Sequence, residues 1–419
     1  MLSRGSTYSL VLRATDGRKC FNHIRQARNI RSILQTDPRN PIQNCGAPRS
    51  QRNVLYVAYP LAPVNEESCG GAEQVLFSLE REMARRGVAT TVAACEGSRA
   101  SGRLVETGAV ALAFDQLAER DAEHNACVLA AAAADGGLQL IHDQGGRFWT
   151  QAAALDIPVL ATLHLPPSFY PANVFDAVPE NVYFNCVSAA QLKSFRDIPQ
   201  VLGTVRNGVA LELFPATSEK GDYLLWLGRI CEEKGVHLAL QAAELADVPL
   251  IVVGPSYMYV RDHEYFEAEV EPLLARNPAF GFVGSPSFAC KVELLRRARG
   301  LLVTSTVEET SSLVAIEAMA CGTPVLAFAR GALPEVVLDE QTGFIVESIE
   351  EMAAASYRLK EIAPAACRRH VERNHSIRNT AAEYERLYER VTELHRSRAL
   401  SLPLGSTMAA VAGLAESGD

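Results

Sequence analysis

Residues 300–329 read GLLVTSTVEETSSLVAIEAMACGTPVLAFA, and their pattern is the clearest indication of the class of fold. The apolar runs at its two ends, GLLVTST and PVLAFA, predict two short buried strands. Between them, Ser312 is a good N-cap and Gly322, two residues before a proline, is a good stop, so a helix is expected. This helix should run from about Leu313 to Ala320. Strand, helix and strand in this order indicate parallel strands joined by a helical crossover.

The same alternation extends along the rest of the chain from residue 53 onward. The sequence GGAEQVLFSLEREMARRG predicts a helix, because its apolar residues recur every three or four positions. Short apolar runs predict strands at NVLYVAYP, ATTVAAC, AVALAF, LQLIHD, PVLATLH, VYFNCVS and LGTVRNG, and later at DYLLWLGRI, PLIVVG and GFIV. We therefore expect an α/β protein with two doubly wound, Rossmann-like domains facing each other, and a ligand site in the cleft between them.

Changes in composition suggest where the domains begin and end. The expected parts are a basic N-terminal extension (1–52), two Rossmann-like domains (53–206 and 207–380), a C-terminal helix that returns to the first domain (381–400) and a tail (401–419). The extension is rich in arginine and poor in acidic residues, so a targeting peptide or a membrane-surface arm are alternatives to an extension without fixed structure.

Composition excludes several classes of protein. The formal net charge is -9, which disfavours broad nucleic-acid binding, because phosphate contacts need clustered Lys and Arg. No apolar run is long enough to cross a bilayer, and no signal-peptide pattern is present. The ten cysteines contain no C-x-x-C pair, which favours reduced, buried thiols over a zinc site or disulfide framework. We expect a cytoplasmic protein, with peripheral contact at the inner membrane face as an open alternative.

Two glutamates in the opening stretch are the strongest chemical signal. Glu309 is expected in the loop before the helix and Glu317 within it. The backbone N–H groups of Ser312, Leu313 and Val314 would point out of the helix start, where anions such as phosphate bind. A carboxylate beside such amides suits a ligand that carries both hydroxyls and phosphate, such as a nucleotide sugar. The alternative, Glu317 as a solvated helix residue, is disfavoured by its apolar neighbours.

Two cations form a second signal in LGRICEEKG. Arg229 directly follows a predicted strand, and Lys234 is expected to open the next helix. Cations fixed at the carboxyl edge of a sheet can hold a diphosphate and stabilise its charge as it leaves. No D-x-D sequence occurs in the chain, although transferases that use a divalent metal usually need such a carboxylate pair. We therefore expect no metal and no other cofactor.

Three further residues are weaker candidates. Gly70 and Gly71 lie between the first strand and its helix, where a backbone can approach a phosphate closely, and a plain turn is an equal alternative. The spacing is not G-x-G-x-x-G, which disfavours a nicotinamide dehydrogenase. His164 ends a predicted strand and could bond a sugar hydroxyl, whereas His142 is expected to be a packing or cleft-wall residue.

Taken together and in order, these motifs resemble glycosyltransferase family four, the retaining enzymes with the GT-B fold. The resemblance runs from Asn53 to about residue 397 and includes GGAE, TLH, CVSAAQ, RNGV, GRICEEKG, FVG, EAMACGTPV and GALPEVV. It implies transfer of a hexose from a UDP- or GDP-sugar with retained configuration, in which the leaving diphosphate takes the proton of the acceptor.

The resemblance also implies roles for individual residues. Glu309 should contact hydroxyls of the donor sugar, and Glu317 the ribose. Arg229 and Lys234 should clamp the diphosphate. The implied catalytic set is Glu309, His164, Arg229 and Lys234, and the implied donor-binding set is Gly70, Gly71, Arg229, Lys234, Glu309, Ser311, Ser312, Leu313 and Glu317.

The chain departs from the family pattern at one place. Many relatives have E-P-F-G-L where this chain has Glu309-Thr310-Ser311-Ser312-Leu313, which predicts a changed donor-sugar preference with phosphate binding kept. A non-catalytic nucleotide-sugar-binding module and an epimerase or phosphorylase of the same fold are the alternative functions. The acceptor stays open between glycans, lipids and small molecules.

Overall fold

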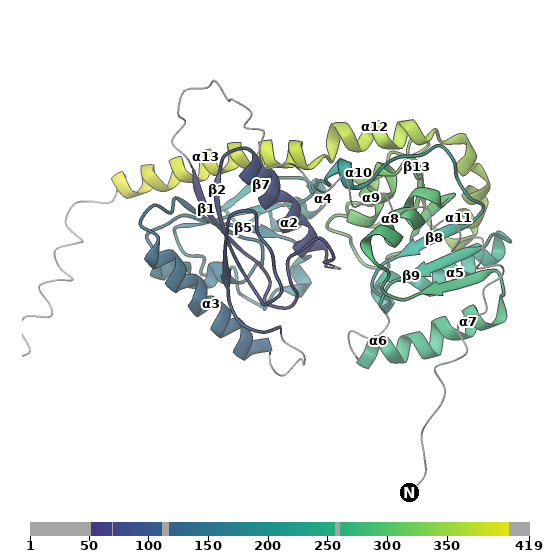
Figure 1. Cartoon of the computed structure of the whole chain (residues 1–419), viewed down its shortest axis with the longest axis horizontal. Coiled ribbons are helices and arrows are strands. Elements are labelled where there is room, and N and C mark those ends of the chain that lie inside the picture. The colour runs from purple at the N-terminus through teal and green to yellow at the C-terminus, as the bar shows by residue number, and fades with distance from the viewer. Residues whose placement is uncertain (1–51, 69, 111–116, 256–259, 402–419) are drawn as a thin grey trace, which may run out of the picture. The chain divides into compact units, whose positions relative to one another are not determined.

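The computed structural model describes two compact units (Figure 1). The residues described are 52–68, 70–110, 117–255 and 260–401. In this part of the chain, the N-terminal unit comprises residues 52–187, 192–206 and 378–401, and the C-terminal unit comprises 188–191 and 207–377. The expected N-terminal extension, the tail and most of the expected strand AVALAF lie outside the described residues.

The N-terminal unit is built on a seven-stranded sheet, counted over the described residues, with the strand order β3-β2-β1-β4-β5-β6-β7. Every neighbouring pair is parallel. Its strands and helices are β1 (Asn53–Val57), α2 (Gly71–Arg85), β2 (Ala89–Ala94), β3 (Arg103–Glu106), α3 (Leu117–Ala134), β4 (Leu140–Asp143), β5 (Val159–Leu163), β6 (Val182–Cys186), α4 (Ala189–Phe195), β7 (Val201–Thr204) and α13 (Ile377–Ser401); the first residues of α4 and of α13 fall in the C-terminal unit.

The C-terminal unit repeats this topology with six strands in the described residues, in the order β10-β9-β8-β11-β12-β13, again all parallel. Its elements are β8 (Leu224–Leu227), α5 (Val236–Leu245), β9 (Leu250–Val253), α6 (Val260–Tyr265), α7 (Glu271–Arg276), β10 (Phe280–Val283), α8 (Phe288–Arg297), β11 (Gly300–Val303), α9 (Leu313–Ala320), β12 (Val325–Phe328), α10 (Leu333–Val336), β13 (Gly343–Val346), α11 (Ile349–Ser356) and α12 (Pro364–Asn374).

The expected doubly wound pattern is confirmed in both units. In each sheet the chain starts at an inner strand, moves outward, and returns to continue on the other side. This is the mononucleotide-binding order, and it creates a switch point where neighbouring strands leave in opposite directions. The switch points lie between β1 and β4 and between β8 and β11.

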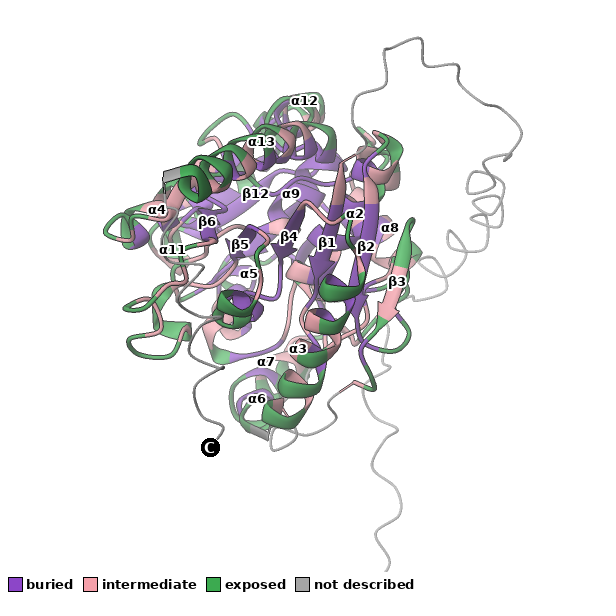
Figure 2. Ribbon diagram, turned by 90° about the vertical axis from the view of Figure 1, so that its left-hand side faces the viewer, coloured by how far each residue is buried: buried purple, intermediate pink, exposed green. Residues whose placement is uncertain are grey.

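Burial follows the periodicity of the sequence. In α2, Val75, Leu76, Leu79 and Met83 are almost fully buried, and the helix stops before Gly87, whose φ is +88°. Figure 2 shows buried strands between helices whose outer faces are exposed. This is the burial expected of a parallel sheet covered on both faces.

Several elements differ from the sequence-based expectation. The strand β3 (Arg103–Glu106) was not expected, because its residues RLVE contain two charges and lie at the edge of the sheet. The strand β10, with the sequence FGFV, was also missed, since a glycine interrupts its apolar run. The helix α9 and the strand β13, in contrast, have the expected bounds.

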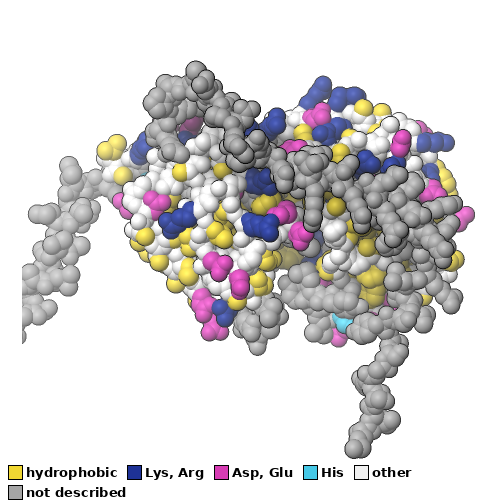
Figure 3. All heavy atoms as spheres, in the orientation of Figure 1, with side chains coloured by type: hydrophobic (Ala, Val, Ile, Leu, Met, Phe, Trp, Pro, Cys, Tyr) yellow, Lys and Arg dark blue, Asp and Glu magenta, His cyan; other side chains and the backbone are white. Residues whose placement is uncertain are grey.

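The described surface carries both signs of charge. On the face drawn in Figure 3, basic and acidic side chains are interspersed. Across the described residues, no helix is both long and apolar enough to span a membrane.

Candidate active site

The strongest candidate residues lie at the switch point of the C-terminal unit. The segment that follows β8 contains Arg229 and Lys234, and the segment that follows β11 contains Glu309. Because β8 and β11 are neighbours and parallel, both segments emerge at the same carboxyl edge of the sheet. Ligands of doubly wound sheets bind at this position.

Lys234 and Glu309 are in direct contact at this edge. The ammonium nitrogen Nζ of Lys234 lies 2.5 Å from Oε1 of Glu309. The hydroxyl of Ser305 donates a hydrogen bond to the same carboxylate oxygen. The Lys234 side chain is 35% exposed and that of Glu309 is 11% exposed, so the pair sits at the surface with the carboxylate on its inner side.

Backbone contacts hold the two segments together. The amide of Thr306 donates to the carbonyl of Glu233 at 2.9 Å. The hydroxyl of Thr304 donates to the carbonyl of Gly235 at 2.8 Å. Gly235 has a φ of +62°, and a Cβ atom there would collide with the Thr304 carbonyl, so glycine is required at this close approach. The position of Lys234 relative to Glu309 is therefore fixed by the main chain.

Two local expectations need correction. Lys234 does not open a helix: it ends a 3₁₀ turn, Glu232–Lys234, and α5 begins at Val236 after the left-handed Gly235. Ser312 occupies the N-cap position of α9, but its side chain makes no capping hydrogen bond. At Lys234, the left-handed conformation of Gly235 separates the 3₁₀ turn from α5.

The start of α9 contains the other expected donor-binding residues. Ser311 is half-buried in the loop before the helix, Ser312 is buried at its N-cap, and Leu313 is its first residue and packs partly against the core. These residues are close in sequence to Glu309, so the loop presents a carboxylate and the first amides of a helix together. Such a combination can bind hydroxyls and a phosphate at once.

Arg229 has a carboxylate partner that the sequence did not suggest. Its Nη1 lies 3.6 Å from Oδ2 of Asp262 in α6. Asp262 is buried, and burial raises the pKa of its carboxyl while nearby Arg229 lowers it. Its Oδ2 has no hydrogen-bond partner within the described residues. The distance of 3.6 Å is too long for a hydrogen bond, so Arg229 and Oδ2 of Asp262 attract each other only as opposite charges.

Glu317 also has an unexpected partner. Its Oε1 lies 2.8 Å from Nζ of Lys291 in α8. Both side chains are largely buried, with 4% of Glu317 and 13% of Lys291 exposed. The Lys291 ammonium also lies 5.1 Å from the ring centre of Phe288 and 5.7 Å from that of Phe214. Aromatic faces and the carboxylate together compensate for the lost hydration of the ammonium.

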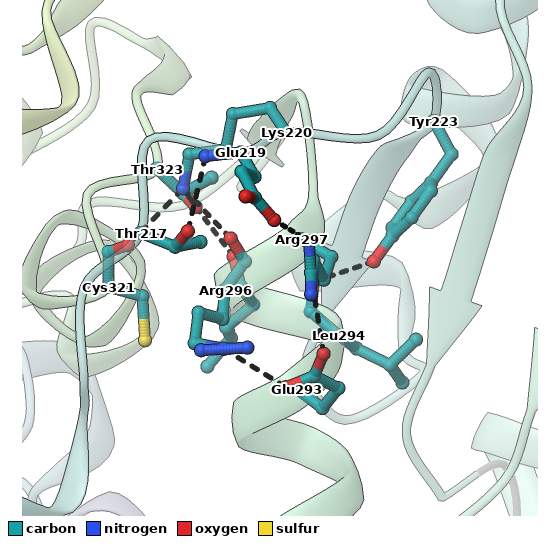
Figure 4. A network of polar contacts seen from close by, with 11 residues as sticks. Thr217, Glu219, Lys220, Tyr223, Glu293, Leu294, Arg296, Arg297, Cys321 and Thr323 are labelled. Carbon is teal, nitrogen blue, oxygen red and sulfur yellow. Dashed lines mark hydrogen bonds and ion pairs between the residues drawn. The ribbon is translucent and has the colours of Figure 1, made fainter. Parts of the chain in front are cut away.

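The ends of α8 and α9 are joined by one lysine (Figure 4). Nζ of Lys220 donates to the carbonyl of Arg296 at 2.9 Å, to the carbonyl of Cys321 at 3.2 Å and to the hydroxyl of Thr323 at 2.7 Å. Helix C-termini leave carbonyls without partners, and a lysine there satisfies them. Burial lowers the pKa of Lys220 to about 8. By fastening both helices, Lys220 helps to set the spacing between Lys291 and Glu317.

We predict that Lys291→Met strongly destabilises the C-terminal unit. The substitution would leave the Glu317 carboxylate buried without a counter-charge, which costs about 3–5 kcal/mol. Urea unfolding followed by the fluorescence of Trp226 measures this cost. The double variant Lys291→Met, Glu317→Gln is the control, because it removes both charges and should recover most of the loss. Equal destabilisation of the single and double variants would show that the ion pair is not the cause.

The candidate glycines of the N-terminal unit lie at the start of α2, after β1. Gly70 is the N-cap residue and Gly71 is the first residue of the helix. The buried carboxylate of Glu73 curls back over Gly70, so that a Cβ atom on Gly70 would collide with it. Burial raises the pKa of Glu73. Because these atoms are the movable end of one side chain, the contact does not by itself require glycine at position 70, and the expected role of Gly70 near a phosphate stays a prediction.

His164 follows β5 in the same unit and is half-buried. Its Nε2 lies 2.6 Å from Oε1 of Gln144, which follows β4. Burial lowers the pKa of His164 to about 4, so the imidazole is neutral at pH 7. His142 is fully buried within β4, as expected of a packing residue, and burial lowers its pKa well below the ordinary value.

The buried histidines predict that acid weakens the N-terminal unit first. Burial lowers the pKa of His124, like that of His164, to about 4, against an ordinary value of 6.5. Between these values the unfolded chain binds protons that the folded unit does not, so the free energy of unfolding falls as the pH falls. Asp143 and Glu73 oppose this trend, because burial raises the pKa of Asp143 to about 6 and also raises that of Glu73. The three histidines His124, His142 and His164, whose pKa values are all lowered, should outweigh these two carboxyl groups.

The chain has two tryptophans, which allow each unit to be followed separately. Trp149 is buried in the N-terminal unit and Trp226 in the C-terminal unit. Thermal unfolding of Trp226→Phe and Trp149→Phe variants at pH 7.5 and pH 5 should show a larger fall in Tm for the signal of Trp149. A larger fall for Trp226 would contradict the prediction.

Sequence reasoning missed Asp262, Lys291 and Ser305. Ser305 could have been found, because it follows a strand at the carboxyl edge, four residues before Glu309. Lys291 and Asp262 lie on helices among other charged residues, and nothing local separates them from solvated positions. No group of three His, Cys, Asp or Glu side chains arranged to hold a metal ion occurs in the described residues.

The known proteins to which this chain is similar in sequence are glycosyltransferases. Residues 214–377 match the family model described as glycosyl transferases group 1. The chain is 27% identical to a D-inositol 3-phosphate glycosyltransferase of Mycobacterium sp. (strain JLS), over 77% of this chain and 85% of that protein. It is 33% identical to a lipopolysaccharide 1,2-N-acetylglucosaminetransferase of Salmonella typhimurium, over 30% of this chain and 35% of that protein.

Solved structures are similar over most of the chain. Sucrose-phosphate synthase from Thermosynechococcus elongatus matches with a TM-score of 0.68 and 22% identity, covering 81% of this chain and 99% of that one. Anabaena HepE in complex with UDP-glucose matches with a TM-score of 0.63 and 17% identity, covering 80% and 99%. At such identities the likeness concerns the fold, and it confirms the expected GT-B class with two Rossmann-like domains.

Proposed function

We propose that this chain is a group 1 glycosyltransferase, because its residues 214–377 match that family model and the relatives described above are glycosyltransferases. It would transfer a hexose from a nucleoside diphosphate sugar to an acceptor hydroxyl, with retention of configuration and without a metal ion. The observation that carries this proposal is the contact between Lys234 and Glu309 at the switch point of the C-terminal unit. At this position the cation can bind the diphosphate of a nucleotide sugar, and the carboxylate can bind the hydroxyls of its sugar.

The proposed roles follow from charge. The ammonium of Lys234 and the guanidinium of Arg229 neutralise the diphosphate, and Glu309 accepts hydrogen bonds from sugar hydroxyls. Glu317, oriented by Lys291, accepts from the ribose. In the structure Lys234 and Arg229 each contact a carboxylate, so the donor diphosphate replaces an existing partner. When Lys234 turns to the diphosphate, the Glu309 oxygen becomes available to the sugar.

The proposed reaction is balanced without a separate base. The acceptor oxygen bonds to C1 of the sugar while the bond between C1 and the diphosphate oxygen breaks. The proton of the acceptor passes to a phosphate oxygen on the same face. Two cations stabilise the charge that the diphosphate gains, which is the step where electrostatic stabilisation counts most.

Thermal shift with nucleotide sugars in EDTA tests this function. The first donor to test is UDP-glucose, because HepE was solved with it, followed by UDP-N-acetylglucosamine and GDP-mannose. A true donor at 100 times its Kd adds about 2.7 kcal/mol to the free energy of unfolding, which raises Tm by about 5–10 °C. Stabilisation only after addition of Mn²⁺ or Mg²⁺ would contradict metal independence.

Product analysis separates the remaining functions. Transfer to an acceptor releases the nucleoside diphosphate and needs a second hydroxyl compound. A binding module would give stabilisation without any product. An epimerase would convert the donor with no acceptor, and a phosphorylase would need inorganic phosphate.

A further inference from the structure

A chain of polar side chains runs from His164 to the C-terminal helix α13 within the N-terminal unit. His164 Nε2 lies 2.6 Å from Gln144 Oε1. The amide Nε2 of Gln144 lies 2.9 Å from His142 Nε2. His142 Nδ1 lies 2.7 Å from the hydroxyl oxygen of Tyr388 in α13. We call His164, Gln144, His142 and Tyr388 the relay.

Three members of the relay are shielded from water. Gln144 is 1% exposed, and His142 and Tyr388 are each 0% exposed. A buried polar atom without a partner lowers the stability of the fold, and water cannot replace a lost partner here. The hydrogen bonds of the relay are therefore coupled: a change in the proton position on one member forces a change on the next.

The orientation of Gln144 fixes the protons of the relay. An amide N–H only donates, so His142 Nε2 accepts from Gln144 and the His142 proton lies on Nδ1, where it donates to Tyr388. Tyr388 in turn donates to the hydroxyl of Tyr56 at 3.3 Å. At the other end, the carbonyl oxygen of Gln144 only accepts, so His164 carries its proton on Nε2.

Thr162 provides an alternative partner for His142. Its hydroxyl oxygen lies 2.8 Å from His142 Nε2 and 2.9 Å from Asn185 Oδ1, so one proton serves two acceptors. If the His142 proton moved to Nε2, Thr162 could accept it and donate to Asn185 alone. With the proton on Nδ1, His142 donates to Tyr388 while Tyr388 donates to Tyr56, so this contact favours the Nδ1–H tautomer together with Gln144.

We propose that Gln144 is a positioning residue for His164, and that Tyr388 of α13 sets its orientation through His142. The relay holds His164 as the neutral Nε2–H tautomer with a fixed ring plane. The C-terminal helix thereby takes part in orienting His164, although Tyr388 is 246 residues from His142 in the sequence.

The proposal predicts that Tyr388→Phe changes the tautomer of His164, which Tyr388 does not contact within the relay. Without the tyrosine hydroxyl, the Nδ1–H of His142 loses its acceptor, and the tautomer with the proton on Nε2 becomes favoured because Thr162 accepts it. The amide of Gln144 must then rotate to turn its oxygen toward His142. This rotation presents the amide N–H to His164, which must change to the Nδ1–H tautomer.

Nitrogen-15 NMR of histidine-labelled full chain reads these tautomers directly. The signals of His164 are assigned by their loss in His164→Gln. The expected result is a protonated Nε2 on His164 in the wild type and a protonated Nδ1 in Tyr388→Phe. A wild-type His164 protonated on Nδ1, or a Tyr388→Phe variant with an unchanged His164, would overturn the proposal.

The matched control is Thr380→Val. Thr380 is also buried on α13, and its hydroxyl donates to the carbonyl of Arg206 at 2.8 Å, away from the four residues of the relay. This variant loses a buried hydroxyl from the same helix, so its loss of stability should match that of Tyr388→Phe, while the tautomer of His164 stays unchanged. If both variants changed the tautomer of His164, the cause would be the lower stability of the N-terminal unit, and the proposal would be wrong.

The effect on turnover rests on the proposed function, whereas the tautomer does not. In Gln144→Met, which keeps the side-chain length and removes both hydrogen bonds, kcat should fall about 10-fold to 100-fold with the donor KM within about twofold. An unchanged kcat beside a changed tautomer would refute the positioning role. A wild type without transferase activity whose tautomers respond as expected would instead refute the proposed function and leave the relay intact.

Discussion

Glu309→Gln is expected to lower kcat/KM by about 1,000-fold while the protein keeps its fold. The proposed role of Glu309 needs a full negative charge toward the sugar, and the glutamine amide supplies only a weaker acceptor and a competing donor. The free energy of unfolding should stay within about 1 kcal/mol of the wild type, because Lys234 is partly exposed and water replaces its lost partner.

Glu308→Gln is the matched control for this variant. Glu308 is the preceding residue in the same loop, and its side chain is exposed. Its replacement removes the same charge from the same segment, and turnover should remain within about twofold of the wild type. A turnover of Glu309→Gln within fivefold of the wild type would remove Glu309 from the site.

Lys234→Met completes a double-mutant cycle with Glu309→Gln. If the two side chains act on one ligand as a unit, the double variant should lose scarcely more activity than the worse single variant. Fully multiplied losses would show that the two residues act independently.

Gly331→Ala is expected to displace the Glu309 loop and lower turnover by about 100-fold. Gly331 has a φ of +57°, and a Cβ atom there would lie 2.6 Å from the amide nitrogen of Glu309 and closer still to its carbonyl oxygen. The neighbouring amide of Ala332 donates to that same carbonyl at 2.7 Å. The turn and the loop therefore have to move apart. Left-handed strain and overpacking should together lower the free energy of unfolding by about 2–4 kcal/mol.

Two glycines separate the causes of this effect. Gly87 also has a positive φ, +88°, but open space around its Cβ position, so Gly87→Ala measures the conformational strain alone. Gly284→Ala places a methyl group in open space without a positive φ. Urea unfolding and turnover of the three variants should show a loss of activity for Gly331→Ala only. A comparable loss in Gly87→Ala would indicate general destabilisation.

Most of the secondary structure could be predicted because its signals are local. The helix α9 is bounded by Ser312 and by Gly322, whose φ of +74° only glycine adopts easily, and an apolar sequence lies between them. The elements that were missed, such as β3 at the sheet edge, lack a continuous apolar run. These segments form strands because they pair with neighbouring strands, and their own residues do not indicate that pairing.

The candidate site could be predicted in part. Lys234 and Glu309 were singled out from strand ends, and the structure brings them into contact because β8 and β11 are neighbours. The partners of Arg229 and Glu317 were not foreseen. Asp262 and Lys291 lie on helices where a charged side chain ordinarily faces water, so only their burial distinguishes them.

Local sequence patterns were enough to predict the alternation of strands and helices in two doubly wound halves, and the strand ends that carry charged groups. The spacing of apolar residues and the positions of glycines act over only a few residues. Which charged groups meet, and which partners the buried histidines contact, depends on the packing of distant segments. Lys291 meets Glu317 because α8 and α9 pack together, and Tyr388 meets His142 because α13 returns to the N-terminal unit. Such pairings depend on packing between distant segments, which no local pattern encodes.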